Sequence, residues 1–190
     1  MEFDARSTVM AVWSGVGVLW LAAALRASRP VRIQPAASRI PHLALVLAAG
    51  VLLFSHWARQ GWLDVRIVPD ASAWRGTGLI LTVVGTTIAV WARLVLGRNW
   101  SGRVTIKAQH RLVQNGPYRV VRHPIYSGLL LAGLGTALVF GRLAGFLAVA
   151  LAVAGWWTKS RLEDRYLRAE FGEAYSAYSG RVKALIPFLL

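Results

Sequence analysis

Five stretches of this chain contain no Asp, Glu, Lys or Arg, and they constrain its fold more than any other feature. They cover residues 9–25, 40–58, 76–92, 123–141 and 143–158. A helix that crosses a bilayer needs about 20 mostly apolar residues, with a range of about 17–25. The fifth stretch is short, but Lys159 and Arg161 can extend it, because long basic side chains reach the headgroups. The sequence therefore predicts an all-α, polytopic integral membrane protein with five transmembrane helices.

The alternative is a soluble bundle of buried helices. Hydrophobic residues make up 56% of the 190 residues, which is high for a soluble domain. Five such stretches in so short a chain favour the membrane. The first stretch follows Glu2, Asp4 and Arg6 instead of a basic segment, and no cleavage site is recognisable before Arg26. We therefore expect a retained helix rather than a signal peptide.

The absence of cysteine excludes disulfides, thiolate metal sites and a cysteine nucleophile, and we expect no metal site. The net charge of +14 comes mostly from arginine. A basic balance can indicate nucleic-acid binding, but these arginines lie in loops between apolar stretches. The sequence therefore favours anionic lipid headgroups as the partner and no nucleic acid.

The basic residues are unevenly distributed among the loops, and this predicts an orientation. The loops after the first and third stretches contain several basic residues and no acid, whereas Asp64 and Asp70 offset the arginines of the loop after the second. Short loops rich in Lys and Arg remain in the cytoplasm. We therefore expect the first loop, the third loop and the C-terminus to be cytoplasmic, and the N-terminus to be outside.

The fourth and fifth stretches are joined by a very short link around Arg142, and both are rich in Gly, Ala and Ser. Small residues let membrane helices approach closely, so we expect a tight antiparallel hairpin. We expect one structural domain with two regions. Residues 1–97 form three helices, and residues 98–190 form a cofactor loop, the hairpin and a C-terminal helix.

Polar groups converge on the expected cytoplasmic side. The hairpin places His123 and Glu163 at the same membrane depth, and Lys159 lies one helical turn before Glu163. The Gly116-Pro117 turn can fold the preceding loop beneath the hairpin. With Tyr118 and Tyr126, these residues predict a pocket for a cation that carries a planar base, because carboxylates and aromatic faces attract cations.

Less specific interpretations remain open at this point. Glu163 and Asp164 could pair only with neighbouring basic residues at helical spacing. Arg122 could mark the membrane edge by contacting phosphates. His123 could cap the helix that Pro124 begins, since proline is favoured in a first helical turn.

Two motifs occupy the second half of the chain. The first is Gly116-Pro117-Tyr118-Arg119-x-x-Arg122-His123-Pro124-x-Tyr126-x-Gly128. The second is Glu163-Asp164-x-x-Leu167-x-x-x-Phe171-Gly172-x-x-Tyr175-x-x-Tyr178, followed by Ile186-Pro187. Together they resemble the motifs of the isoprenylcysteine carboxyl methyltransferase family, whose wider relatives include the membrane phospholipid N-methyltransferases. The resemblance covers roughly residues 98–190, and it implies a membrane enzyme that uses S-adenosylmethionine.

The resemblance also implies roles for individual residues. The cofactor contacts would be His110, Arg111, Leu112, Val113, Tyr118, His123, Pro124, Ile125, Tyr126 and Glu163. Catalysis would fall to Lys159, Arg161 and Glu163. Two positions depart from the family pattern, since Lys159 stands where arginine is usual and Asp164 where glutamate is usual. Lysine cannot form the bidentate fork of arginine.

The expected acceptor is lipophilic, and three classes remain open. An isoprenylcysteine carboxylate needs only a positioning cation, whereas an amine such as that of phosphatidylethanolamine would need a base such as Glu163 or His123. A small thiol is the third. A non-catalytic protein that binds anionic lipids is the alternative outside enzymes. A transporter is disfavoured because nothing resembles two discontinuous half-helices.

Overall fold

The computed structural model describes residues 4–25, 32–33, 36–56, 60–97, 105–106 and 112–187. Five α-helices dominate it: α1 (Ala5–Leu25), α2 (Ala36–Phe54), α3 (Ser72–Leu96), α4 (Pro124–Phe140) and α5 (Leu143–Arg181). Each covers most or all of one of the five apolar stretches, so the expected helical class is confirmed. Two short strands, β1 (Arg32–Ile33) and β2 (Thr105–Ile106), pair antiparallel and join the two long loops.

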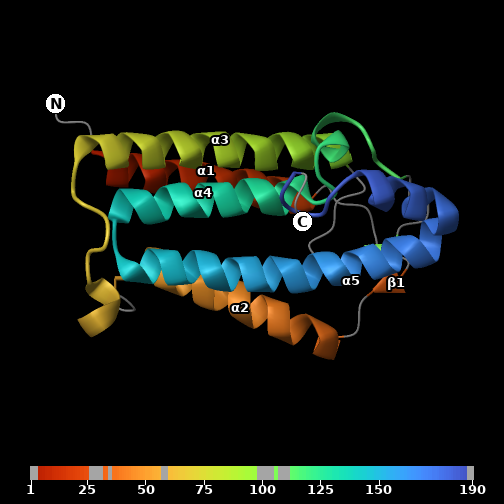
Figure 1. Cartoon of the computed structure of the whole chain (residues 1–190), viewed down its shortest axis with the longest axis horizontal. Coiled ribbons are helices and arrows are strands. Elements are labelled where there is room, and N and C mark those ends of the chain that lie inside the picture. The colour runs from red at the N-terminus through yellow and green to blue at the C-terminus, as the bar shows by residue number, and fades with distance from the viewer. Residues whose placement is uncertain are drawn as a thin grey trace.

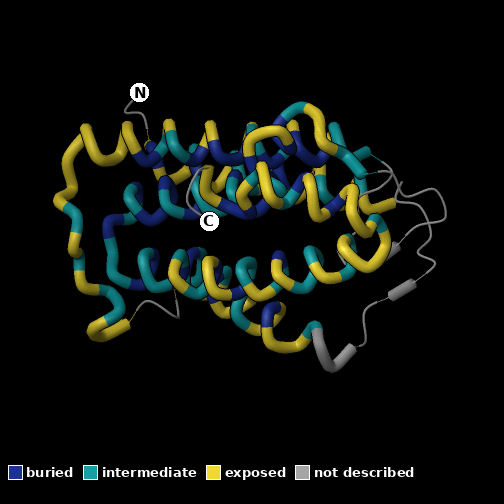
Figure 2. Tube along the Cα trace, turned by 45° about the vertical axis from the view of Figure 1, so that its right-hand side comes forward, coloured by how far each residue is buried: buried dark blue, intermediate teal, exposed yellow. Residues whose placement is uncertain are grey.

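Three of these helices, α1, α3 and α5, are long and apolar enough to cross a membrane. The apolar parts of α2 and α4 are shorter. These helices support a multi-pass integral membrane protein, while the count of five crossings stays a prediction. At 39 residues, α5 is nearly twice the length that a bilayer requires, so its polar second half continues beyond the apolar span. Figure 2 shows exposed residues along the outer sides of the helices and buried residues where helices meet.

The closest helix pair is α3 with α4, which lie side by side in Figure 1. Two glycines of α3 face two glycines of α4: a Cβ at Gly78 would lie 2.5 Å from the carbonyl oxygen of Gly135, and one at Gly85 equally close to that of Gly128. The backbones therefore touch, because no side chain separates them. Between these contacts, the Thr82 hydroxyl donates to the carbonyl oxygens of Gly78 and Ala132 at 2.9 and 3.3 Å.

This arrangement corrects the expected packing of the last two spans. The short link does join α4 to α5, and Gly145 lies close to Ala137 beside it. However, the small residues of α4 pack mainly against α3, and Gly155 of α5 packs against Val46 and Leu45 of α2. Figure 1 shows α1, α3 and α4 grouped on one side and α2 with α5 on the other.

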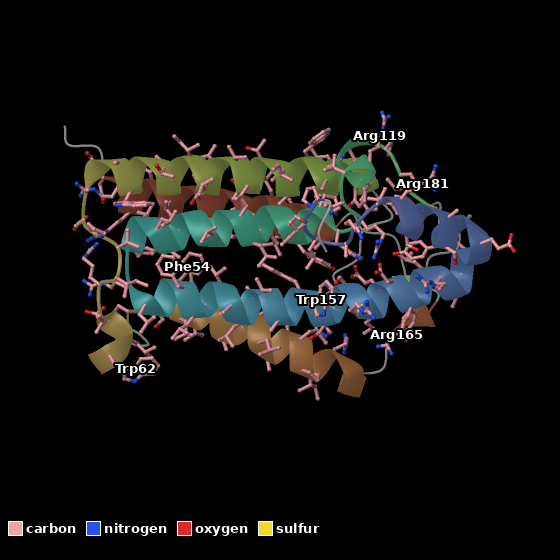
Figure 3. The ribbon with its side chains drawn as sticks, viewed as in Figure 1. Phe54, Trp62, Arg119, Trp157, Arg165 and Arg181 are labelled. Atoms are coloured by element: carbon pink, nitrogen blue, oxygen red, sulfur yellow. The ribbon has the colours of Figure 1, made fainter. Side chains whose placement is uncertain are left out.

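The space between α4 and α5 contains a cavity of about 170 Å³. Its walls come from four helices and are apolar, with Trp13 on α1, Leu53 and Phe54 on α2, Leu129 on α4 and Trp156 on α5. Figure 3 shows Phe54 in this space. The edge of the Phe54 ring meets Trp13, with ring centroids 5.4 Å apart.

The last part of the chain folds back on the beginning of α4. Gly172 has φ 52° and ψ −122°, a conformation that residues with a Cβ rarely adopt, and it kinks α5 there. The chain after the helix then pairs with the residues before α4. The N–H groups of Arg122 and His123 donate to the carbonyl oxygens of Lys183 and Ala184 at 2.8 and 3.0 Å. The backbone hydrogen bond to Ala184 therefore holds His123 in place independently of the contacts of its side chain.

Candidate active site

His123 lies where the start of α4 meets the polar half of α5. It occupies the N-cap position of α4, directly before Pro124, but its side chain makes no capping hydrogen bond to the helix, so capping is not the role of the imidazole. The imidazole instead contacts two carboxylates of α5. Its Nδ1 lies 3.3 Å from Oε2 of Glu163, and its Nε2 lies 2.8 Å from Oδ1 of Asp164. The residue is buried, with 6% of its surface exposed.

Glu163 is also held by Tyr126 and Lys159. The Tyr126 hydroxyl donates to Oε1 of Glu163 at 2.7 Å. Nζ of Lys159 lies 3.9 Å from the same oxygen, and it also lies 5.2 Å from the centre of the Tyr126 ring. The predicted proximity of His123, Tyr126, Lys159 and Glu163 is therefore present, and these four residues are called the Glu163 cluster below.

Aromatic rings extend the Glu163 cluster toward the apolar cavity. The Tyr126 ring stacks on the His123 ring on one side, at 5.6 Å between centroids, and on the Trp156 ring at 6.1 Å. Trp156 also lines the cavity between α4 and α5. A polar site and an apolar cavity therefore meet at this tryptophan, which sequence reasoning missed. Its position three residues before Lys159 on α5 was the signal that could have indicated it.

Asp164 connects the site to the rest of the fold. Oδ2 accepts a hydrogen bond from Nη2 of Arg122 at 2.7 Å, and Oδ1 accepts one from the Tyr175 hydroxyl in addition to its contact with His123. The Arg122 guanidinium also donates to the carbonyl oxygen of Ser179 at 3.2 Å. Arg122 is therefore paired with Asp164 inside the protein. Contact with membrane phosphates is not needed to explain its position.

These contacts change how the groups outside the helical spans hold protons. Burial by itself would lower the pKa of His123, but its hydrogen bonds to Asp164 and Glu163 and their negative charges outweigh this and raise it. Burial also opposes the charge of Arg122, yet the hydrogen bond and charge of Asp164 leave the pKa of Arg122 raised. The site therefore favours an imidazolium between two carboxylates, beside a guanidinium.

Tyr118 is buried beside the site rather than in the Glu163 cluster. Its hydroxyl donates to the carbonyl oxygen of Ala92 on α3 at 3.3 Å, and its own carbonyl oxygen accepts from the Tyr178 hydroxyl at 2.6 Å. It follows Gly116 and Pro117 in the short helix η3 (Gly116–Arg119), where Gly116 has φ +56°. Burial and the nearby charge of Glu163 raise the pKa of the Tyr118 hydroxyl.

The other predicted site residues fall into three groups. Pro124 and Ile125 are buried at the start of α4, and Val113 packs against the apolar cluster that contains Tyr118 and Tyr126. Arg161 lies on another face of α5, exposed, with its guanidinium 5.7 Å from the centre of the Trp157 ring. Leu112 is half-buried, and His110 and Arg111 lie outside the described residues.

Comparison with known proteins identifies relatives of this arrangement. The family model for phospholipid methyltransferase matches residues 74–174, which is more than half of the chain and includes the whole Glu163 cluster. A probable protein-S-isoprenylcysteine O-methyltransferase of Oryza sativa subsp. indica is 31% identical over 115 residues, covering 59% of this chain and 60% of the relative. The cobalt-zinc-cadmium resistance protein CzcN of Cupriavidus metallidurans is 36% identical over 124 residues, covering 62% of this chain and 55% of the relative.

The fold also resembles a solved structure. A eukaryotic intramembrane Ras methyltransferase, isoprenylcysteine carboxyl methyltransferase, superposes with a TM-score of 0.58 at 21% identity, covering 100% of this chain and 70% of that one. The likeness concerns the fold. The matched region spans about 60% of the length of the curated plant relatives. The resemblance noted in the sequence is thereby confirmed.

Proposed function

The chain belongs to the phospholipid methyltransferase family, and we propose that it is an integral membrane methyltransferase that uses S-adenosylmethionine. Its acceptor would be lipophilic and would be methylated at the cytoplasmic face, with the N-terminus outside and the C-terminus in the cytoplasm. An isoprenylcysteine carboxylate is the first acceptor to test. The observation that supports this proposal is the meeting of His123, Tyr126 and Glu163 beside an apolar cavity.

The residues present fit the proposed cofactor. S-adenosylmethionine, when bound, supplies a methyl group on a positively charged sulfonium. Carboxylates and aromatic faces attract such a cation, and the Glu163 cluster offers both, through Glu163 and the stacked rings of Tyr126 and Trp156. We assign cofactor contacts to His123, Tyr126 and Glu163. Tyr118 would support the cofactor site without contacting the cofactor. Its hydroxyl is bound to the carbonyl oxygen of Ala92 on α3, which holds η3 against that helix.

The chain's own residues would mainly orient the reactants and exclude water, because methyl transfer is an in-line displacement. Lys159 is the cation that we propose to hold an acceptor carboxylate, since it lies against Glu163 and Tyr126, whereas Arg161 is exposed over Trp157. A carboxylate needs no base. An amine acceptor would have to lose a proton, and Glu163 could accept it, whereas His123 is favoured in its protonated form.

The apolar part of the acceptor would lie in the cavity between α4 and α5. Trp156 both stacks on Tyr126 and lines this cavity, so a lipophilic group there would end at the Glu163 cluster. The volume of about 170 Å³ is close to that of apolar cavities that stay dry and bind small hydrocarbons. A longer chain would continue between the helices into the bilayer.

The test is calorimetric titration of detergent-purified protein with S-adenosylmethionine and S-adenosylhomocysteine. We expect saturable binding that Glu163→Gln and His123→Asn each weaken by about tenfold or more, because each removes a charge-assisted contact. Glu170→Gln makes the same chemical change at an exposed position on α5 and should bind like the wild type. Absence of binding to the intact protein would refute the proposal.

The acceptor requires a separate assay with labelled methyl donor. Farnesylcysteine derivatives, phosphatidylethanolamine in vesicles and small thiols would be offered in parallel. Methylation of the farnesylcysteine carboxylate is the expected result. Activity only on the amine lipid, or only on thiols, would overturn that choice of acceptor while leaving the methyltransferase itself in place.

A further inference from the structure

Asp164 is the acceptor that several chain segments share. Its carboxylate forms hydrogen bonds with His123 and Arg122, which lie in the segment before α4. It also accepts a hydrogen bond from Tyr175, which lies in the part of α5 beyond the kink. Only 13% of its side chain is exposed. An exposed ion pair on a helix surface is held loosely and contributes little. Asp164 differs from such a pair because three side chains from two segments bind its carboxylate.

We propose that Asp164 is a positioning residue, which acts through His123 on Glu163 and is itself held by Arg122 and Tyr175. The proposal rests on the function proposed above, in which Glu163 contacts the cofactor. Asp164 is not assigned any contact with cofactor or acceptor. Asp164 fixes the orientation of the His123 ring, and that ring contacts the Glu163 carboxylate.

The geometry of the imidazole supports this assignment. With Nε2 held by Asp164 at 2.8 Å, the ring can turn little, and Nδ1 then faces Oε2 of Glu163 at 3.3 Å. The other oxygen of Glu163 is bound by Tyr126. Both carboxylate oxygens of Glu163 are therefore oriented, one through Tyr126 directly and the other through the His123–Asp164 pair. A ring released from Asp164 would leave Oε2 without a fixed partner.

The support for Asp164 is built by the kink at Gly172. The chain turns there, and Tyr175, only 1% exposed, comes back to Asp164 eleven residues earlier in the same helix. A straight α5 would carry Tyr175 away along the helix axis, since eleven residues of regular helix span about 16 Å. Tyr175 also meets the Tyr178 ring edge-on, which fixes its own orientation.

The charged and titratable groups around His123 make the proposal measurable. From α5 it faces Glu163, Asp164 and, through Asp164, Tyr175; Lys159 reaches Glu163. From its own segment it has Arg122, which is paired with Asp164, and the stacked Tyr126 ring. Two carboxylates favour the imidazolium. Removal of one opposite charge at this distance typically lowers a pKa by about 1 or more.

The experiment is a nitrogen-15 NMR titration of His123 in detergent micelles, assigned among the 4 histidines with His123→Asn. Asp164→Asn should lower the pKa of His123 by about 1 and weaken S-adenosylhomocysteine binding about tenfold. Asp164→Glu keeps the charge and should restore most of both. Tyr175→Phe should move the pKa slightly upward, because Asp164 then has one donor fewer, while Tyr166→Phe should change neither.

Two results would overturn the proposal. One is an unchanged His123 pKa in a folded Asp164→Asn protein. The other is an equal fall in Asp164→Asn, Asp164→Glu and Tyr175→Phe, which would indicate general loosening rather than positioning by charge. A wild-type protein that binds no cofactor would refute the proposed function, but the His123 titration would still report on Asp164.

Discussion

Replacing Gly85 with alanine should force α3 away from α4. The new Cβ would lie 2.5 Å from the carbonyl oxygen of Gly128 and 2.9 Å from Cα of Ala132, whereas ordinary contacts begin at 3.4 Å. The obstructing atoms belong to the backbone, so no side chain can turn aside. The two helices must therefore separate by about 1 Å at this point, a gap that forfeits about a quarter to a half of the dispersion energy of each contact.

The size of the effect follows from this separation. Overpacking usually costs about 1–3 kcal/mol. We expect the upper end, about 3 kcal/mol, because membrane helices depend on close packing rather than on the hydrophobic effect. The same shift would also stretch the bond from the Thr82 hydroxyl to Ala132, now 3.3 Å, and its contact with Thr136, now 3.4 Å.

The assay is unfolding of the detergent-purified protein with sodium dodecyl sulfate, followed by tryptophan fluorescence. Gly17→Ala is the matched control, because a Cβ there meets no atom within 4 Å. Alanine is the better helix former, so the control should be neutral or up to about 1 kcal/mol more stable. If both variants unfold at the same midpoint, the reasoning about backbone contact between α3 and α4 is refuted.

Three further outcomes are expected. Arg122→Lys loses the fork that binds Asp164 and Ser179, so hydrogen exchange of the His123 and Val182 amides, which bond to Ala184 and Tyr178, should become about tenfold faster; unchanged exchange would contradict this role. Gly133→Leu places a side chain in the cavity, where a Cβ meets only Val149 at 3.8 Å. It should raise the acceptor KM about tenfold with S-adenosylhomocysteine affinity unchanged, and a loss of that affinity would contradict the separation of the two sites. The raised pKa of His123 means that its stabilising contribution is complete below about pH 6.5 and is lost as pH rises through the folded-state pKa. The difference in unfolding free energy between wild type and His123→Gln should therefore be largest below about pH 6.5 and shrink as the pH rises above it.

The helices could be predicted from the sequence because soluble proteins rarely leave a membrane-length stretch without charge. The pairing of helices could not. Gly128 and Gly135 are small residues that fit any close neighbour, and the sequence does not say whether that neighbour is α5 or α3. In the structure the neighbour is α3. Gly78 and Gly85 of α3 are seven residues apart, as Gly128 and Gly135 are, and the antiparallel helices place each glycine of one pair against a glycine of the other. That reciprocal spacing was the available signal.

The site divides in the same way. Lys159 and Glu163 are one turn apart on any regular helix, and the link at Arg142 returns the chain so that His123 meets Glu163. Both relations follow from local geometry. The contact of Tyr175 with Asp164 does not, because it depends on the positive φ of Gly172 within an otherwise helical segment. A glycine permits such a kink but does not require it.

The charge of His123 has a consequence for the proposed cofactor and its product. With His123 protonated, Arg122, Lys159 and His123 outnumber Glu163 and Asp164 by one positive charge; with His123 neutral, the five groups balance. The sulfonium of S-adenosylmethionine carries a positive charge that the thioether product lacks. Protonation of His123 should therefore weaken binding of the cofactor more than binding of the product. We expect the ratio of the two dissociation constants, cofactor over product, to rise as pH falls through the pKa of His123 and to become flat in His123→Gln. A wild-type ratio that does not vary with pH would show that the imidazole does not sense the sulfonium.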